Sequence, residues 1–233
     1  MTPLKRQAER VWLFDLDNTL HNAGASSFRH FDGAMNDYIT QALQVSPAQA
    51  DHLRAHYWAR YGSTLLGLVR HHGVRVEHFV RHTHAFPSLE QEVVAHRHDL
   101  AALQRLPGRK IVLTNAGRDY ALRVLRALGL DGLFEQVIGI EQMHMFGQLR
   151  PKPDARMFQA LAARLGVPPG RCVLVEDTLL HQKAAHSVGM KTVWMQRWLK
   201  HHAHGPEVGV YLHRRPAYVC ARISKLQQLC RVP

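Results

Sequence analysis

An apolar run near the start of the chain ends in two acids, and this pattern constrains the fold more than any other feature. Val11 to Leu16 is apolar except for Asp15, so the run predicts a buried strand. Alternate residues of a strand point the same way. We therefore expect Asp15 and Asp17 to face one pocket at the end of a parallel strand, where α/β sheets place their ligand sites. Two carboxylates at such short distance repel each other unless a cation or a shared proton compensates their charge. The pair therefore indicates either a divalent metal or a nucleophile beside an acid/base. The simpler alternative is that the pair caps the following helix.

Two further apolar runs end in polar residues, and a lysine lies between two prolines in a stiff loop. Lys110–Leu113 is followed by Thr114 and Asn115, Cys172–Val175 is followed by Glu176 and Asp177, and the loop Gln148–Asp154 contains Lys152. Taken alone, Thr114 is more often a helix cap, Lys152 is more often a solvated lysine, and an acid pair is more often the first turn of a helix. Their joint occurrence behind apolar runs favours one shared site.

The order of these motifs, DxDxT, T-N, K and E-D, resembles the haloacid dehalogenase-like (HAD) hydrolase superfamily from about Val11 to Leu199. Three segments are also similar to its pyrimidine 5′-nucleotidase branch: Trp12–His21, Tyr57–Leu68 and Thr114–Ala116. The signature Y-G-x-T-L-x-G-L, which begins at Tyr61, is the discriminating piece. The chain departs from this branch after the E-D motif, where it has Thr178-Leu179-Leu180-His181 instead of T-L-E-N.

The resemblance implies a two-step phosphate monoester hydrolysis. Asp15 would attack the phosphate to give an aspartyl-phosphate, and Asp17 would protonate the leaving alkoxide and then deprotonate the attacking water. Mg²⁺, which prefers oxygen ligands, would be held by the Asp15 carboxylate, the Asp17 backbone carbonyl and Asp177, with Glu176 close by.

The same resemblance implies a phosphate-binding set on the other side of the nucleophile. Thr114 would donate its hydroxyl to a phosphoryl oxygen. Backbone N–H groups after it, including that of Asn115, would add the anion-binding start of a helix that runs from Arg118 to Leu128. Lys152 would supply a fixed positive charge to the phosphoryl group and to Asp15.

The pattern along the chain predicts an α/β fold with a Rossmann-like core, a parallel sheet with helices on both faces, and an inserted helical cap. We expect the core over residues 1–22 and 99–233 and the cap over residues 23–98. Strands are predicted near 111–114, 137–140, 172–176 and 192–195, and helices near 121–128, 155–165 and 181–188. A last edge strand is expected near Tyr218–Cys220, followed by a closing helix through Leu226 and Leu229.

The cap would select the substrate, because the core motifs contact only the phosphate. The resemblance points to four cap residues that offer an aromatic wall and hydroxyl groups for a nucleobase: Tyr57, Tyr61, Ser63 and Thr64. The alternative is that these residues only pack the cap helices together. His82 and His84 carry little weight as pocket residues, because the chain has 18 histidines.

Composition limits the compartment and the class of protein. No segment is long and apolar enough to span a membrane, and Met1 to Arg10 lacks the apolar stretch of a secretory signal. The three cysteines are widely spaced and odd in number, and Cys172 lies in a predicted buried strand, which favours reduced thiols and a cytoplasmic protein.

The basic charge raises an alternative of another class. The chain has 30 Lys and Arg against 18 Asp and Glu, a net charge of +12, which attracts polyanions. A basic nucleic-acid-binding module on an inactive HAD fold is therefore an alternative. The basic residues are scattered, however, and no RNA-binding signature is present, so we expect no specific nucleic-acid partner and interpret the charge as steering small phosphorylated substrates.

The prediction is a Mg²⁺-dependent phosphatase for UMP- or CMP-type nucleoside monophosphates. The second alternative is a HAD phosphatase for another small phosphomonoester, such as a sugar phosphate, pyridoxal phosphate or phosphoglycolate. A dehalogenase is disfavoured, because that chemistry uses no metal and does not need an acid/base at Asp17. The sequence does not predict the oligomeric state.

Overall fold

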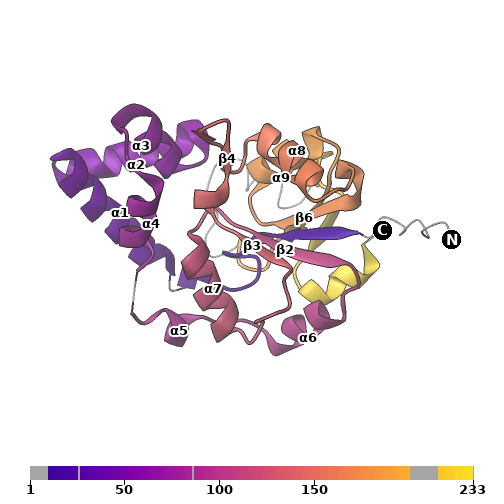
Figure 1. Cartoon of the computed structure of the whole chain (residues 1–233). Coiled ribbons are helices and arrows are strands. Elements are labelled where there is room, and N and C mark those ends of the chain that lie inside the picture. The colour runs from indigo at the N-terminus through magenta and orange to yellow at the C-terminus, as the bar shows by residue number, and fades with distance from the viewer. Residues whose placement is uncertain (1–9, 26, 86, 200–214, 233) are drawn as a thin grey trace.

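The computed structural model describes residues 10–25, 27–85, 87–199 and 215–232. A six-stranded parallel sheet with the strand order β3-β2-β1-β6-β7-β8 forms its centre (Figure 1). The strands are β1 (Val11–Phe14), β2 (Arg109–Leu113), β3 (Gln136–Ile138), β6 (Cys172–Glu176), β7 (Lys191–Met195) and β8 (Ala221–Ile223). The first strand of the chain therefore lies in the middle of the sheet, between β2 and β6. This arrangement confirms the predicted α/β fold.

Helices cover both faces of the sheet, as predicted. One face carries α8 (Ala155–Arg164) and α9 (Leu179–Ser187), and the other carries α5 (Leu89–Glu92), α6 (Arg97–Arg105) and α7 (Arg118–Ala127). Because side chains alternate along a strand, Val11 and Leu13 join the cluster on the first face, whereas Trp12 and Phe14 join the cluster on the second. All four side chains are buried. A strand buried on both faces has a nearly continuous apolar sequence, which is why β1 could be predicted.

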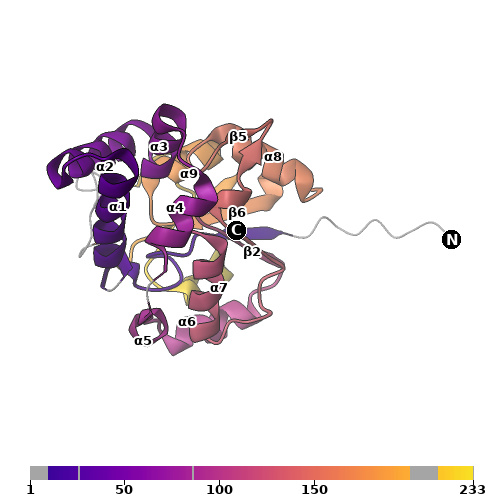
Figure 2. The same cartoon turned by 60° about the vertical axis from the view of Figure 1, so that its left-hand side comes forward.

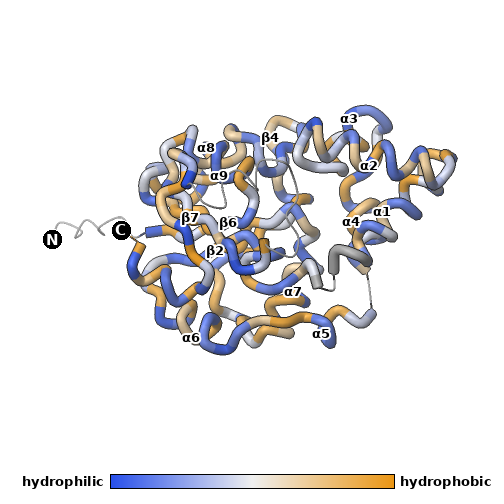
Figure 3. The backbone as a smooth tube through the Cα atoms, turned by 180° about the vertical axis from the view of Figure 1, so that it is seen from behind, coloured by the Kyte–Doolittle hydropathy of each residue, from blue (hydrophilic) through white to orange (hydrophobic). Residues whose placement is uncertain are grey.

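Four helices between β1 and β2 form a group of their own beside the sheet (Figures 1 and 2). They are α1 (Ser27–Leu43), α2 (Pro47–Tyr61), α3 (Thr64–His72) and α4 (Val76–Thr83), and they share a separate hydrophobic cluster. Polar and apolar residues alternate along them (Figure 3), as amphipathic helices require. Local signals fix their ends: Ser46 and Gln49 form a capping box at the start of α2, and Gly62 ends it in the left-handed conformation.

The helix α5 lies within the range predicted for the cap but packs on the core. It contacts α7, and Leu89 is fully buried in the cluster that includes Trp12 and Phe14. Figure 1 places α5 beside α7, apart from α1–α4. The division at residues 22 and 98 remains a prediction, and we propose that the cap ends before Leu89.

The cap helices approach the core closely at two glycines. A Cβ atom on Gly117 would lie 2.2 Å from Cγ1 of Val80, which belongs to α4. A Cβ atom on Gly62, which follows α2, would lie 2.9 Å from Cδ of Pro153 and 3.5 Å from Cδ2 of Leu180. The cap therefore contacts the loop after β2, the loop that contains Lys152, and the first turn of α9.

Two details near the C-terminal half differ from the prediction. The predicted loop Gln148–Asp154 begins with the strand β5 (Gln148–Leu149), which forms a small antiparallel hairpin with β4 (His144–Met145). The last strand, β8, begins one residue after the predicted Tyr218–Cys220, because that segment contains a turn in which the Val219 N–H donates to the Pro216 carbonyl. The closing helix through Leu226 and Leu229 is present as a 3₁₀ helix over Leu226–Arg231.

The structure also bears on the predictions about the cysteines and about membrane-spanning segments. Cys172 is buried in β6 as predicted, and Cys220 and Cys230 are exposed free thiols. Within the described ranges, no helix is both long enough and apolar enough to cross a lipid bilayer. The basic N-terminal segment, apart from Arg10, lies outside the described residues.

Candidate active site

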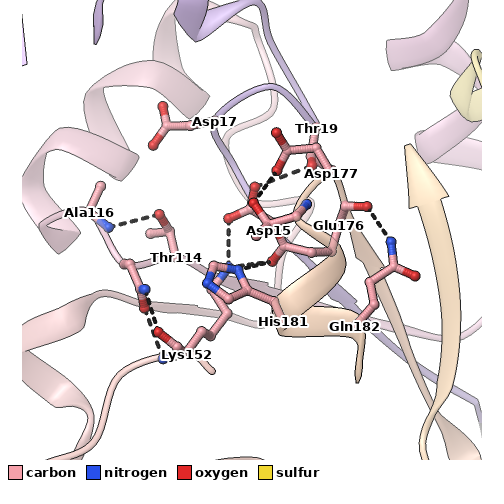
Figure 4. Close-up of polar contacts among 12 residues, drawn as sticks. Asp15, Asp17, Thr19, Thr114, Ala116, Lys152, Glu176, Asp177, His181 and Gln182 are labelled. Atoms are coloured by element: carbon pink, nitrogen blue, oxygen red, sulfur yellow. Dashed lines mark hydrogen bonds and ion pairs between the residues drawn. The ribbon is translucent and has the colours of Figure 1, made fainter. Parts of the chain in front are cut away.

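A buried lysine joins two of the predicted acids at the end of the central strands (Figure 4). Nζ of Lys152 lies 2.7 Å from Oδ1 of Asp15 and 2.7 Å from Oε2 of Glu176. β1 and β6 pair in parallel with Phe14 opposite Val175, so Asp15, which follows β1, lies at the level of Glu176, the last residue of β6. The lysine is fully buried. The alternative of a solvated loop lysine is therefore wrong.

The electrostatics of this cluster follow from burial and from an excess of negative charge. Burial alone would lower the pKa of Lys152, but the carboxylates of Asp15 and Glu176 outweigh it and raise that pKa above its usual value. Burial and the charge of Glu176 raise the pKa of Asp15 to about 7 against the opposing effect of Lys152. Burial, Glu176 and Asp15 hold the pKa of Asp177 well above its usual value. One lysine therefore offsets only part of the negative charge of three carboxylates.

Three carboxylates at this edge form a donor set that suits a hard cation. Oxygen atoms of Asp15, Glu176 and Asp177 all lie within 4.8 Å of one another. Glu176 is already engaged at both oxygens, because Oε2 contacts Lys152 Nζ and lies 3.1 Å from Nδ1 of His181, while Oε1 accepts from the N–H of Thr178. The excess charge and the all-oxygen ligands fit Mg²⁺.

The side chain of Asp17 points away from this cluster. Figure 4 shows its carboxylate turned away from Asp15. Oδ1 of Asp17 accepts from the hydroxyl of Tyr120 at 2.7 Å and lies 3.0 Å from Nε2 of His21. Strand alternation does not set the direction of Asp17, because β1 ends at Phe14; the charge of Asp17 nevertheless contributes to the raised pKa of Asp15.

The two residues after β2 have different surroundings. Thr114 is buried, and its hydroxyl oxygen accepts from the N–H of Ala116 at 3.0 Å. It does not cap the next helix, because α7 begins after Gly117. The side-chain amide of Asn115 is occupied by the backbone of Lys152: its Nδ2 donates to the Lys152 carbonyl at 2.8 Å, and its Oδ1 accepts from the Lys152 N–H at 3.0 Å. This side chain therefore positions the lysine.

Replacing Asn115 by Ala is expected to act through Lys152. Two neutral hydrogen bonds would be lost, which corresponds to about 2 kcal/mol of unfolding free energy, and phosphate release would fall about 10- to 100-fold as the lysine shifts. Denaturant unfolding and a phosphate-release assay would measure both quantities, with exposed Gln91→Ala as the matched control. Unchanged stability and rate in Asn115→Ala would contradict the positioning role.

The four predicted cap residues bond within the cap. The hydroxyl of Tyr57 lies 2.7 Å from Nε2 of His72, and that of Tyr61 lies 2.7 Å from Nε2 of His71. Ser63 caps α3 by accepting from Leu66 N–H, and Thr64 donates to the carbonyl of Arg54. These contacts favour the alternative that the residues pack the cap, although Gly62, next to two of them, contacts the core.

Comparison with known proteins places the chain in a family. A family model described as haloacid dehalogenase-like hydrolase matches residues 10–189. The chain belongs to the HAD-like hydrolases. The matched range contains Asp15, Asp17, Thr114, Lys152 and the acid pair after β6, and it ends before β7 and β8.

Solved structures and a curated protein are similar to this HAD hydrolase at low identity. A HAD phosphatase from Thermococcus onnurineus is 21% identical with a TM-score of 0.60, and 96% of this chain and 97% of that chain are covered. CbbY from Rhodobacter sphaeroides in complex with phosphate is 19% identical with a TM-score of 0.61, over 95% and 96%. The 2-haloacid dehalogenase of Pseudomonas syringae pv. Tomato DC3000 is 20% identical with a TM-score of 0.56, over 96% and 97%.

Among curated proteins, Phosphate metabolism protein 8 of Saccharomyces cerevisiae is 21% identical over 196 residues, which is 78% of this chain. The match spans 60% of the length of that curated relative. At these identities the solved structures establish the shared fold alone.

Sequence reasoning missed several polar residues of this HAD site. Thr19 donates its hydroxyl to Oδ2 of Asp15, and His21 contacts Asp17. Thr19 and His21 each follow their acidic partner by four residues, a spacing that places the two side chains together in a turn. Tyr120 gave no comparable signal, because it lies 103 positions from its partner. His181 stands where asparagine was expected from the resemblance, and it contacts Glu176.

Proposed function

We propose that this HAD hydrolase is a phosphatase that cleaves small phosphate monoesters through an aspartyl-phosphate at Asp15. The observation that carries the proposal is the buried triplet of Asp15, Lys152 and Glu176 beside Asp177. It holds a carboxylate in one orientation, with Lys152 on Oδ1 and the Thr19 hydroxyl on Oδ2. A preorganised carboxylate with a fixed cation beside it suits in-line attack on an anionic phosphate.

In the proposed two-step reaction, Asp15 is the nucleophile and Asp17 transfers the proton in each step. In the first step an oxygen of Asp15 attacks phosphorus, the bond to the leaving oxygen breaks, and Asp17 gives its proton to that oxygen. In the second step water attacks the same phosphorus, its proton passes to Asp17, and phosphate leaves Asp15. Lys152 stabilises the negative charge on the phosphoryl oxygens in both steps, with the Thr114 hydroxyl as a further donor.

A divalent cation completes the charge balance in this proposal. Asp15 and Asp177 would hold Mg²⁺, with the backbone carbonyl of Asp17 as the third ligand that the family resemblance implies. When bound, Mg²⁺ supplies Lewis-acid stabilisation of the transferring phosphoryl group and neutralises the excess charge of the carboxylates. Glu176 would lie close to the ion and hold Lys152, whose Nζ donates to its Oε2.

The substrate class that we propose is pyrimidine nucleoside monophosphates of the UMP or CMP type. The proposal rests on the signature over residues 61–68, and the net charge of +12 favours anionic substrates generally. The inward hydrogen bonds of Tyr57, Tyr61, Ser63 and Thr64 leave other small phosphomonoesters as the alternative within the same mechanism.

A panel of phosphate esters tests both levels of the proposal. Phosphate release would be measured from nucleoside monophosphates, sugar phosphates, pyridoxal phosphate, phosphoglycolate and p-nitrophenyl phosphate, with Mg²⁺ or with EDTA. We expect the fastest release from UMP or CMP, and a loss of about 100-fold or more in EDTA that added Mg²⁺ restores. Release led by a sugar or cofactor phosphate would retain the mechanism and remove the nucleotide assignment. No release from any ester with Mg²⁺ present would remove the phosphatase assignment.

A further inference from the structure

The carboxylate of Asp17 lies in a small polar site of its own. Tyr120 donates its hydroxyl to Oδ1 at 2.7 Å, and Nε2 of His21 lies 3.0 Å from the same oxygen. His21 is fully buried and Tyr120 nearly so. The three residues come from the turn after β1 and from the first turn of α7. Two donors from separate elements therefore fix one oxygen of the proposed acid/base.

The hydrogen bonds of His21 define which of its nitrogens carries the proton. Nε2 must carry a hydrogen to donate to the Asp17 carboxylate. Nδ1 is buried and has no hydrogen-bond partner among the described residues. A hydrogen on Nδ1 would be a buried donor without a partner, so the tautomer with its hydrogen on Nε2 fits the hydrogen bonds of the site. In that form His21 only donates to Asp17, whereas a tyrosine hydroxyl can also accept.

The cap holds the ring whose hydroxyl contacts Asp17. The ring of Phe31, from α1, packs edge-on against Tyr120 with centroids 5.1 Å apart. The ring of His84, which follows α4, lies 5.6 Å from Tyr120 and 4.6 Å from Phe31. Burial lowers the pKa of His84 to about 4, so its ring packs here in the neutral form. Tyr120 is thus held between the core helix α7 and two cap segments.

We infer that His21 and Tyr120 are positioning residues for Asp17, and that they hold its carboxyl group in the orientation from which its proton passes to the leaving oxygen. This inference rests on the proposed function. The O–H bond of Asp17 breaks as the leaving oxygen takes the proton, and the carboxylate that forms accepts from both donors. Because both contacts reach the same oxygen, Oδ1, they leave Oδ2 of Asp17 as the oxygen that carries the transferred proton. Tyr120 also makes this step depend on the packing of the cap.

The test compares two leaving groups. p-Nitrophenolate is a stable anion that leaves without a proton, whereas an alkoxide needs one. The constant kcat/KM reports the steps up to transfer of the phosphoryl group to Asp15 and excludes the later hydrolysis. It would be measured for p-nitrophenyl phosphate and for the alkyl phosphate that the wild-type protein cleaves fastest, with Mg²⁺.

Four variants distinguish the loss of the hydrogen bonds to Asp17 from damage to the fold. Tyr120→Phe and His21→Leu should lower kcat/KM for the alkyl phosphate about tenfold or more, with a change below about twofold for p-nitrophenyl phosphate. His21→Gln, which keeps an N–H donor, should retain most of the alkyl activity. Tyr38→Phe removes the hydroxyl of another tyrosine–histidine pair, Tyr38 and His78 within the cap, and should change neither constant.

Each other outcome overturns a defined statement. Equal losses on both esters would assign His21 and Tyr120 to the fold alone, and no loss on either would remove both from the reaction. Equal alkyl activities of His21→Gln and His21→Leu would remove the donor role of His21. If His21→Leu does not fold, Tyr120→Phe decides, because it removes only one oxygen. Absence of turnover in the wild-type protein would overturn the proposed function, and the inference with it.

Discussion

Asp15→Asn is expected to lower phosphate release about 10⁴-fold or more, because the amide cannot act as the nucleophile. The substitution keeps the size and shape of the side chain. It also removes a buried charge, whose burial and proximity to Glu176 raise the pKa of Asp15 to about 7. Lys152 keeps Glu176 as an ion-pair partner at 2.7 Å. We therefore expect the loss of activity to occur with little loss of stability, measured as the melting temperature without added metal.

The control for this variant is Asp51→Asn, which changes an exposed acid of α2 that pairs only at the surface. It should retain the wild-type rate. Retention of the full rate by Asp15→Asn would exclude Asp15 as the nucleophile, whatever the metal dependence. A large fall in melting temperature would show instead that the ion pair between Asp15 and Lys152 stabilises the fold more than the neighbouring carboxylates oppose it.

The sheet and its acids could be predicted because they depend on local sequence. β1 and β6 are buried on both faces, so their sequences are nearly continuous apolar runs, and the acids of the site follow directly at their ends. The parallel pairing of β1 with β6 brings Asp15 to the level of Glu176. A buried strand with a charged residue at its end is a pattern that the sequence alone contains.

The direction of individual side chains could not be predicted, because it depends on contacts that are distant in sequence. Lys152 lies 137 positions from Asp15, and Asn115 lies 37 positions from the lysine backbone that it binds. The family resemblance implied the contact of Lys152 with Asp15, but not its contact with Glu176 or the binding of Asn115 to the lysine backbone. Asp17 differs for a local reason: the strand ends at Phe14, and Asn18 adopts a positive φ of 56°, so the turn directs the carboxylate toward Tyr120.

The short hairpin was missed for another reason. β4 and β5 contain two residues each, too few for an alternating pattern to be recognised. Its turn places Phe146 and Gly147 at positive φ, 49° and 73°, which matches the turns that favour hairpins. Phenylalanine is an unusual residue for the first of these positions, so no turn signal is present there.

Lys152→Met is expected to have the second large effect, on stability and on activity together. Methionine fills most of the same volume, but Asp15 and Glu176 would remain buried without the cation that contacts both at 2.7 Å. Removing one partner of a buried ion pair costs about 3–5 kcal/mol, and we expect a loss of that size in metal-free denaturant unfolding. Phosphate release should fall at least about 10³-fold, while exposed Lys183→Met, on α9, should match the wild type in both measurements.

The loss of stability in Lys152→Met should depend on pH and on Mg²⁺ if its cause is electrostatic, and it should not if its cause is a packing defect. In the wild-type protein, Lys152 and His181 outweigh burial and hold the pKa of Glu176 below its usual value. That pair therefore stabilises the fold at neutral pH, and its contribution is lost as the pH falls through the lowered pKa. In Lys152→Met the carboxylates have no lysine, so their pKa values rise and they take up protons as the pH falls below neutral. The stability difference between the two proteins should shrink over that range, and Mg²⁺ should reduce it further by offsetting the same charges. A difference that stays constant with pH and with Mg²⁺ would mean that Lys152 stabilises the fold by packing alone.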